Sequence, residues 1–269
     1  MTSALRTGRL VRSFLATAFI AAAALVVPAA PASAIEVEGS GLTIAATPAV
    51  TSNYLFRGIS QTRNRAALQG TLDVQHDDTG LYIGAFISNV SFLGTNANME
   101  IDGLFGYRRE IFGITFDLGG VYYGYPASDT HGLAVLDFFE GVLKASKEID
   151  MVKLMGTVAV SPNAFGRSGT GLYFEGGADI KLPFDFVGNL RIGHWNLQKN
   201  VRFGTPDYTW GSVGVTRELY EGITLNVSWS STDISKRQCG PNSGPQGNLA
   251  PGGQHICGST FLATLSRAF

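Results

Sequence analysis

The sequence predicts an all-β fold, a single twelve-stranded antiparallel transmembrane β-barrel that runs from Leu42 to Phe269. Three observations lead to this fold class. Short turns alternate with long loops along the chain, and the stretches between them alternate apolar with polar residues. These stretches are about ten residues long, which is the length of a tilted membrane strand, whereas soluble strands average about five or six residues.

The amino-terminal segment has the organisation of a secretory signal peptide. Three arginines form a positive region, an apolar run follows, and Ala32-Ser33-Ala34 is a small-residue cleavage site. An uncleaved membrane anchor is the alternative, but the apolar run is short for a spanning helix. We therefore expect residues 1–34 to be a cleaved signal peptide and residues 35–269 to be the barrel.

Composition favours strands that face lipid. The signal segment contains three arginines and no acidic residue, so the rest of the chain has 17 basic and 21 acidic residues. This balance does not predict a basic surface that binds nucleic acid. Charged residues make up 15% of the sequence, against about 25% in typical soluble proteins. After the signal segment no run of 18 apolar residues occurs, so the sequence predicts no transmembrane helix there.

Five short turns divide the chain at intervals of roughly 35 residues. They lie at Asp77–Gly80, Ile111–Gly113, Glu148–Asp150, Pro183–Asp185 and Tyr220–Gly222. Six longer polar stretches alternate with them, at Ser60–Arg65, Phe92–Asn98, Pro126–Gly132, Pro162–Gly171, Gln198–Pro206 and Ser235–Gly258. This arrangement makes twelve strands with both ends on the short-turn side, as in outer-membrane barrels with short periplasmic turns and longer external loops.

Each strand is predicted from a two-residue period. In chain order the clearest examples are Leu68–Gln75, Met99–Phe105, Ile114–Leu118, Leu172–Leu182, Ile223–Ser230 and Ser259–Phe269. We expect the last strand to pair with the first, so that the sheet has no open edge. A soluble secreted β-domain would alternate in the same way, and the length of the strands favours the barrel.

Three positions fit this pattern less well. Pro48 interrupts the first strand, which runs toward Phe56, so that this strand is bulged or begins at Ala49. Asp137 and Glu140 have opposite parity within one predicted strand, which implies a bulge or a different register.

One motif carries a family resemblance. Thr51–Thr62, TSNYLFRGISQT, resembles the opening motif of the TorF family, proteobacterial outer-membrane conserved hypothetical proteins that are described as porins. The similarity continues through Ala66–Phe92, Met99–Arg108 and Val121–Pro126, and it is weaker but colinear up to Phe269. The resemblance implies a porin-like β-barrel in the outer membrane of a Gram-negative bacterium.

Nine charged residues have the parity expected for the inside of the barrel. This predicted pore lining consists of Asp73, Glu100, Asp102, Asp117, Lys153, Glu175, Asp179, Lys181 and Arg191. Its acidic majority favours cations or neutral solutes, because rings of charge set selectivity. Twelve strands lie between eight-stranded barrels, which side chains fill, and sixteen-stranded porins, which are open. An open channel and a lumen plugged by paired charges are both hypotheses.

Three arginines lie in or beside the first loop. Arg57, with Arg63 and Arg65, would bind lipopolysaccharide phosphate or screen entering solutes, and the alternative is that Arg57 is a solvated loop charge.

The two cysteines, Cys239 and Cys257, both lie in the last long loop. A pair of cysteines in an oxidising compartment favours a disulfide. A metal site with His255 is the alternative, but two thiols and one imidazole leave a ligand missing. We expect no metal and no cofactor.

A lipid hydrolase is the alternative from a different class. It would need a Ser, a His and an orienting polar residue on neighbouring lipid-facing strands. Only His194 lies near the outer end of a strand, and no Ser occurs in a nucleophile motif such as G-x-S-x-G.

The sequence therefore predicts a non-enzymatic outer-membrane porin, in which small hydrophilic solutes diffuse through a narrow acid-lined lumen. The alternatives are a plugged barrel with a structural or surface-interaction role, and the lipid hydrolase. The expected partners are outer-membrane lipid or lipopolysaccharide and the solutes. No feature marks a subunit interface, so we expect a monomer.

Overall fold

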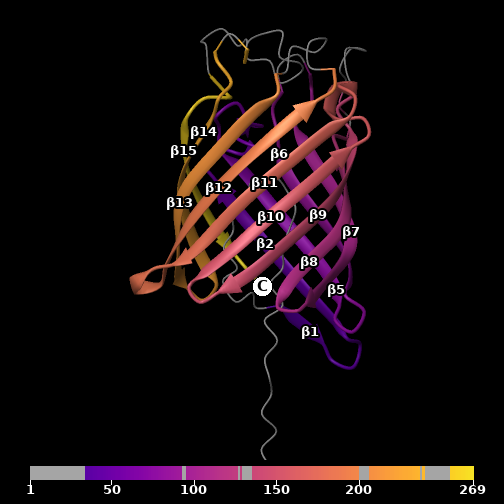
Figure 1. The fold of residues 1–269 in the computed structure, drawn as a ribbon, viewed down its shortest axis with the longest axis vertical. Helices are drawn as coiled ribbons and strands as arrows, with labels where there is room; N and C mark the ends of the chain where they lie inside the picture. The colour runs from indigo at the N-terminus through magenta and orange to yellow at the C-terminus, as the bar shows by residue number, and fades with distance from the viewer. Residues whose placement is uncertain are drawn as a thin grey trace, which may run out of the picture.

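The computed structural model describes residues 34–92, 95–126, 128, 135–199, 206–236, 238–239 and 255–269. Within them, twelve antiparallel strands form a closed barrel (Figure 1), which confirms the predicted fold class. The strands are β2 (Leu42–Thr51), β5 (Ala67–His76), β6 (Leu81–Asn89), β7 (Met99–Ile111), β8 (Ile114–Gly124), β9 (Phe138–Ile149), β10 (Val152–Ser161), β11 (Gly171–Lys181), β12 (Phe186–Leu197), β13 (Tyr208–Tyr220), β14 (Ile223–Thr232) and β15 (Thr260–Arg267). The predicted signal peptide, apart from its last residue, lies outside the described residues.

Each strand of the barrel pairs with its neighbours in the chain, and β15 pairs with β2 to close the ring. The five predicted short turns all connect paired strands at one end of the barrel. At the second of them, Phe112 and Gly113 have φ values of 54° and 72°, the left-handed conformation that a two-residue hairpin turn requires. Two short 3-10 turns, η1 (Phe165–Arg167) and η2 (Pro183–Asp185), occur in connections. None of the helices in these ranges is long and apolar enough to cross a membrane.

The junction between β2 and β15 explains the position of Pro48. The backbone N–H of Ser52 donates to the carbonyl of Ala263 in β15 (2.9 Å), and that of Ala46 donates to the carbonyl of Phe269, just after β15 (3.1 Å). Pro48 has the same parity as Ala46 and Ser52, so the N–H that proline lacks is one that would face β15. On its other edge, Pro48 still pairs with Gly70 of β5. The strand is therefore continuous from Leu42, and the expectation of a bulge or of a start at Ala49 is wrong. The short strand β1 (Ile35–Val37) pairs with the first residues of β2.

The expected irregularity around Glu140 is also absent from the described residues. The strand begins at Phe138 rather than before Asp137. The Asp137 carboxylate accepts hydrogen bonds from the Tyr125 backbone N–H (2.9 Å) and the Tyr122 hydroxyl (3.0 Å), so it lies at the strand's entry. Glu140 consequently has regular inward parity in β9, and the prediction of a bulge there is wrong.

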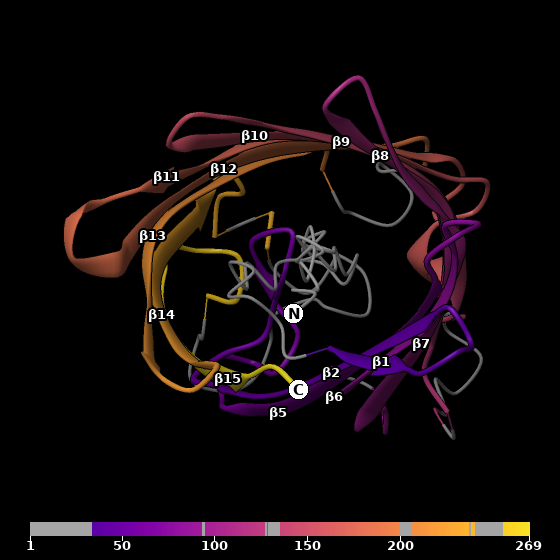
Figure 2. The same ribbon diagram turned by 90° about the horizontal axis from the view of Figure 1, so that it is seen from below.

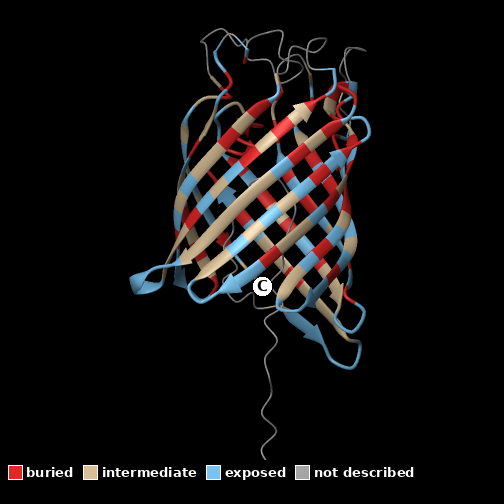
Figure 3. Cartoon of the chain, viewed as in Figure 1, coloured by how far each residue is buried: buried red, intermediate tan, exposed pale blue. Residues whose placement is uncertain are grey.

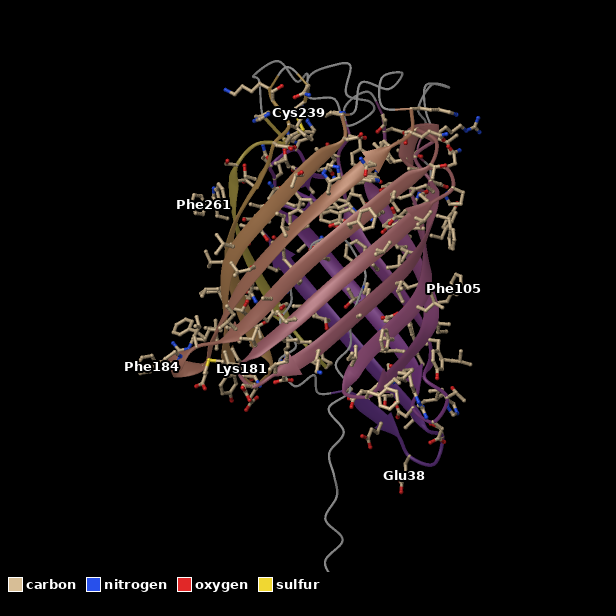
Figure 4. All side chains as sticks on the ribbon, viewed as in Figure 1. Glu38, Phe105, Lys181, Phe184, Cys239 and Phe261 are labelled. Atoms are coloured by element: carbon tan, nitrogen blue, oxygen red, sulfur yellow. A yellow bond between two sulfur atoms is a disulfide. The ribbon has the colours of Figure 1, made fainter. Side chains whose placement is uncertain are left out.

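The two faces of the wall differ in polarity. Outward-facing side chains are mostly apolar and exposed, and Phe105 and Phe261 project from the outside of the wall (Figure 4). Inward-facing side chains are largely polar or aromatic, and exposed and buried residues alternate along the strands (Figure 3). A wall that is apolar outside and polar inside is the arrangement of a barrel surrounded by lipid.

The first loop does not extend away from the barrel. The predicted first strand toward Phe56 ends instead at Thr51. The chain then forms a separate two-stranded hairpin, β3 (Leu55–Phe56) and β4 (Ile59–Ser60). Figure 2 shows this segment, between β2 and β5, inside the ring of strands. We call residues 53–62 the lumen hairpin.

A charge on the outer wall tests the lipid-facing assignment. Val227 faces outward in the middle of β14, and Leu81 faces outward at the first residue of β6, beside a short turn. We expect Val227→Arg to lower the free energy of unfolding by about 2–4 kcal/mol and Leu81→Arg by about 0–1 kcal/mol, because a charge costs most at the bilayer midplane. Urea titration of protein refolded into phospholipid vesicles measures both. Equal losses for the two variants would contradict the assignment.

Candidate functional site: the barrel lumen

The structure places all nine predicted pore-lining residues on the inward parity of their strands. Asp73 is on β5, Glu100 and Asp102 on β7, Asp117 on β8, Lys153 on β10, Glu175, Asp179 and Lys181 on β11, and Arg191 on β12. Lys181 is at the short-turn rim, where it forms an exposed ion pair with Glu148. Their contribution to passage of a solute remains a prediction.

A first charge cluster joins β5, β7 and β8 around Arg108, a residue that the predicted lining omitted. Its guanidinium lies 3.3 Å from the Asp117 carboxylate and 3.4 Å from that of Asp73. Tyr82 stacks under the guanidinium and donates to Asp117 at 2.8 Å. The Tyr82 ring reaches this far because Gly106 has no side chain, since a Cβ there would lie 2.7 Å from the Tyr82 hydroxyl.

A second cluster lies on β11 and β12. The Arg191 guanidinium donates to the Asp179 carboxylate at 2.8 Å, and the Asn189 amide donates to the same oxygen at 2.9 Å. Inward residues of this part of the wall, such as Lys153 and Glu175, are only half-buried. An inward side chain that is half-exposed has open space in front of it, so the lumen is accessible to water beside β10 and β11.

The long-loop half of the lumen is packed instead. All ten residues of the lumen hairpin are buried. The Asn53 side chain organises its base, because its Oδ1 accepts from the hydroxyls of Ser60 (2.6 Å) and Thr62 (3.1 Å). A backbone hydrogen bond from Gln61 N to Tyr54 O (2.7 Å) continues the hairpin ladder. The polar groups of this buried segment are thus largely satisfied within the segment itself.

Arg57, at the tip of the hairpin, is 4% exposed, so the reading of it as a solvated loop charge is wrong. Its guanidinium makes two parallel hydrogen bonds to the Glu140 carboxylate of β9, at 3.0 and 2.6 Å. The guanidinium carbon lies 3.7 Å from the ring centroid of Tyr173 and 4.5 Å from that of Trp195. Buried charges persist only when they are paired in this way. Of the other two arginines, Arg63 is half-buried and Arg65 is exposed.

A pair of carboxyl groups lies beside the hairpin on β7. The Tyr54 hydroxyl donates to Glu100 at 2.9 Å, which joins the hairpin to this strand. Glu100 and Asp102 are each 1% exposed, and no salt bridge to either is found in the part of the chain that the structure describes. Neither carboxylate oxygen of Asp102 has a hydrogen-bond partner among the described residues. The two acids are therefore buried there without a basic partner, and carboxyl groups in such a position do not both persist as anions.

The hairpin extends from β7 across to the opposite wall. Phe56 packs edge-on against Tyr123 and Trp195, with ring centroids 5.6 and 5.7 Å apart. A Cβ at Gly58 would lie 2.8 Å from atoms of both Trp210 and Thr232, so only glycine fits this close to β13 and β14. The hairpin therefore occupies the cross-section of the lumen at this height and forms its constriction.

The last loop also contacts the hairpin. Ser60 N donates to the Ile256 carbonyl at 2.9 Å. Next to Ile256, the Sγ atoms of Cys257 and Cys239 form a disulfide, and Figure 4 shows Cys239 at the long-loop end of the barrel. The segment between the cysteines lies largely outside the described residues. Among the described residues, no group of three or more His, Cys, Asp or Glu side chains is arranged to hold a metal ion.

His194 faces outward, as the hydrolase hypothesis requires, but no serine is among its hydrogen-bond partners in the described part of the chain. Its ring nitrogens lie 2.9 Å from the Thr209 hydroxyl and 3.2 Å from the Asn196 amide. Beside it, a shallow groove of about 600 Å³ on the outer wall is lined mainly by apolar residues, including Val158 and Phe174. The structure supplies a threonine hydroxyl where the hypothesis needs a serine.

Sequence reasoning missed the constriction although a signal was present. Arg57-Gly58 stands between two short runs that contain apolar residues, which is the arrangement of a two-residue hairpin loop. Glu140 appeared only as an acid that did not fit its strand. The lumen residues Arg108 and Lys144 also have simple inward parity and were left out.

Comparisons with known proteins agree with the architecture. A family model described as "Bacterial protein of unknown function (Gcw_chp)" matches residues 36–269. Among solved structures, the chain is similar to the KdgM porin in complex with disordered oligogalacturonate, with a TM-score of 0.53 and 6% identity over 84% of this chain and 98% of that chain. It is also similar to the NanC porin, with a TM-score of 0.51 and 11% identity over the same shares. None of the curated proteins compared with the chain matches it.

Removing the carboxylate at the constriction tests its importance. We expect Glu140→Gln to lower the free energy of unfolding by about 3–5 kcal/mol, because it leaves the buried Arg57 guanidinium without a counter-charge. Glu148→Gln is the matched control, since its exposed ion pair with Lys181 contributes about 0–1 kcal/mol. Equilibrium unfolding in urea measures both. A loss for Glu140→Gln no larger than the control's would show that the ion pair does not hold the hairpin.

Proposed function

We propose that this chain, which belongs to the Gcw_chp family of bacterial proteins of unknown function, is an outer-membrane channel for passive diffusion of small hydrophilic solutes. The observation that carries the proposal is the lumen: it is polar, it has water-accessible space beside β10 and β11, and the lumen hairpin narrows it toward the long loops. No bond is made or broken in this function, and the side chains of the lumen act only by size and charge.

An outer-membrane location follows from the same proposal. The apolar outer wall and the sidedness of turns and loops fit a barrel with its short turns in the periplasm. The fold is shared with KdgM and NanC, which are described as porins, and the resemblance to the TorF family agrees with this location. In this orientation the lumen hairpin lies in the half of the barrel nearest the cell exterior.

Selectivity would arise at two levels. The lumen hairpin limits the size of solutes, because it crosses the lumen between β7 and β14. Glu175 is half-buried on the inward face of β11 and has no salt bridge among the described residues, so it supplies negative charge to the lumen, whereas Asp179 and Glu140 are each paired with an arginine. Cations and neutral solutes would therefore pass more readily than anions.

A second candidate function is a closed barrel with a structural or surface-interaction role. The burial of the whole lumen hairpin favours it, because ten buried residues leave little free cross-section at that height. The water-accessible space beside β10 and β11 favours the channel. The two candidates share the same barrel wall and differ in whether the lumen is open from one end to the other.

Single-channel recording separates the two candidates. We expect purified protein in planar lipid bilayers to give discrete current steps. A variant in which the lumen hairpin, residues 53–62, is replaced by a Gly-Ser-Gly linker should give larger steps, because the constriction is removed. Steps from the variant alone would favour the closed barrel with the hairpin as its plug. No steps from either folded protein would overturn the channel.

Glu175 is expected to contribute to the preference for cations. In a KCl gradient, Glu175→Gln should lower the ratio of K⁺ to Cl⁻ permeability by about twofold or more, since charge lining a pore sets its selectivity. Asp78→Asn is the control, because Asp78 is exposed in a short turn outside the lumen. Reversal potentials measure both. Unchanged selectivity in Glu175→Gln would remove this residue from the proposed lining.

A further inference from the structure

The wall around Arg57 has the chemistry of a binding site for a planar cation. Glu140 of β9 presents both carboxylate oxygens to the guanidinium, at 3.0 and 2.6 Å. Tyr173 of β11 and Trp195 of β12 present ring faces at 3.7 and 4.5 Å from the guanidinium carbon. A carboxylate fork together with aromatic faces is how proteins recognise guanidinium groups.

We propose that Glu140, Tyr173 and Trp195 form a guanidinium-binding cage in the barrel wall, of which Arg57 is a tethered and exchangeable occupant. A solute with a guanidinium group would compete with Arg57 for this cage. An ammonium group would compete less well, because it is a compact charge that cannot make two parallel hydrogen bonds to the fork or stack flat on the rings.

The cage is held in place without the hairpin. The Tyr123 hydroxyl of β8 donates to Glu140 Oε2 at 3.1 Å. The Tyr173 hydroxyl accepts from Trp210 Nε1 of β13 at 3.0 Å. The three cage residues themselves belong to β9, β11 and β12, which hydrogen bonds of the barrel fix relative to one another. The carboxylate of Glu140 and the rings of Tyr173 and Trp195 therefore keep their orientation if Arg57 leaves the cage.

The tether is under backbone strain. Arg57 has φ of 49° and Gly58 has φ of 81°, the two left-handed positions of a type I′ hairpin turn. Such positions favour Asn, Asp or Gly, and a long side chain with a Cβ there is unfavourable. Contacts with the cage offset this strain. A free guanidinium carries no such strain, which makes exchange with Arg57 feasible.

Exchange would release the tip of the lumen hairpin from the wall. The hairpin would still be attached through the Tyr54 hydrogen bond to Glu100. A cationic solute could thus widen the constriction by occupying the cage. The binding step itself does not depend on the proposed channel, because it requires only a folded barrel.

Arg57→Asn provides the test, since Asn suits the turn and removes the guanidinium. We measure thermal unfolding of the full-length barrel in detergent with added methylguanidinium chloride. The melting temperature of Arg57→Asn should rise with a saturable dependence on methylguanidinium, while wild type, in which Arg57 must first be displaced, should respond only at higher concentrations. Methylammonium chloride should require an at least about fivefold higher concentration for half the effect, because it lacks the planar fork. Arg57→Asn combined with Glu140→Gln should not respond.

Two outcomes would overturn the cage: no response from folded Arg57→Asn, or equal responses from wild type and both variants. If Arg57→Asn does not fold, Arg57→Gly replaces it, and the refolding yield with and without methylguanidinium becomes the measurement. A yield restored by methylguanidinium but not by methylammonium supports the cage, and no restoration overturns it. Since none of these measurements uses current, their failure leaves the proposed channel standing, and the absence of current leaves the cage standing.

Discussion

The constraint on which the structure depends is closure of the sheet. In lipid, every backbone N–H and C=O of a spanning strand needs a partner within the protein, and a sheet provides this only when it has no edge. Here β15 meets β2 in a short ladder, supplemented by the paired backbone groups of Ala46 and Phe269. Pro48 lies within this ladder, and its ring takes the place of one donor. The two ends of the barrel chain are thus joined without a regular run of hydrogen bonds through that position.

Closure creates an interior that side chains or water must fill. The groups that line this interior differ between the two ends of the barrel. Toward the short turns, carboxylates and guanidinium groups on neighbouring strands pair along the surface of the lumen, as Arg191 does with Asp179. Toward the long loops, aromatic side chains from the wall surround the lumen hairpin. Glu140 lies at this end, and its burial is tolerable because Arg57 brings the compensating charge to it.

Much of the fold could be predicted from the sequence because its signals are local. The five short turns and the alternation of residues within strands such as β14 involve neighbours in the chain, and they fix strand number and sidedness. The constriction could not be predicted in this way. Arg57 and Glu140 are separated by 83 residues, and each alone resembles an ordinary feature, a loop charge and a misplaced acid. Their complementarity exists only after closure has brought β9 opposite the first loop. The same holds for Arg108, whose partners come from two other strands.

The motif that carried the family resemblance, Thr51–Thr62, begins at the last residue of β2, and all of it from residue 53 onward is the lumen hairpin and not a stretch of wall. Its residue types follow from that position. Asn53 closes the base through its side-chain oxygen, and Tyr54 supplies a hydroxyl for a buried carboxylate. Gly58 allows contact with the opposite wall, where any Cβ would collide. A wall strand needs only alternation, which many sequences satisfy, whereas a segment folded into a closed interior must satisfy each polar group individually. A segment of this kind is therefore specified residue by residue, which is why the most recognisable part of the sequence is also the part that narrows the lumen.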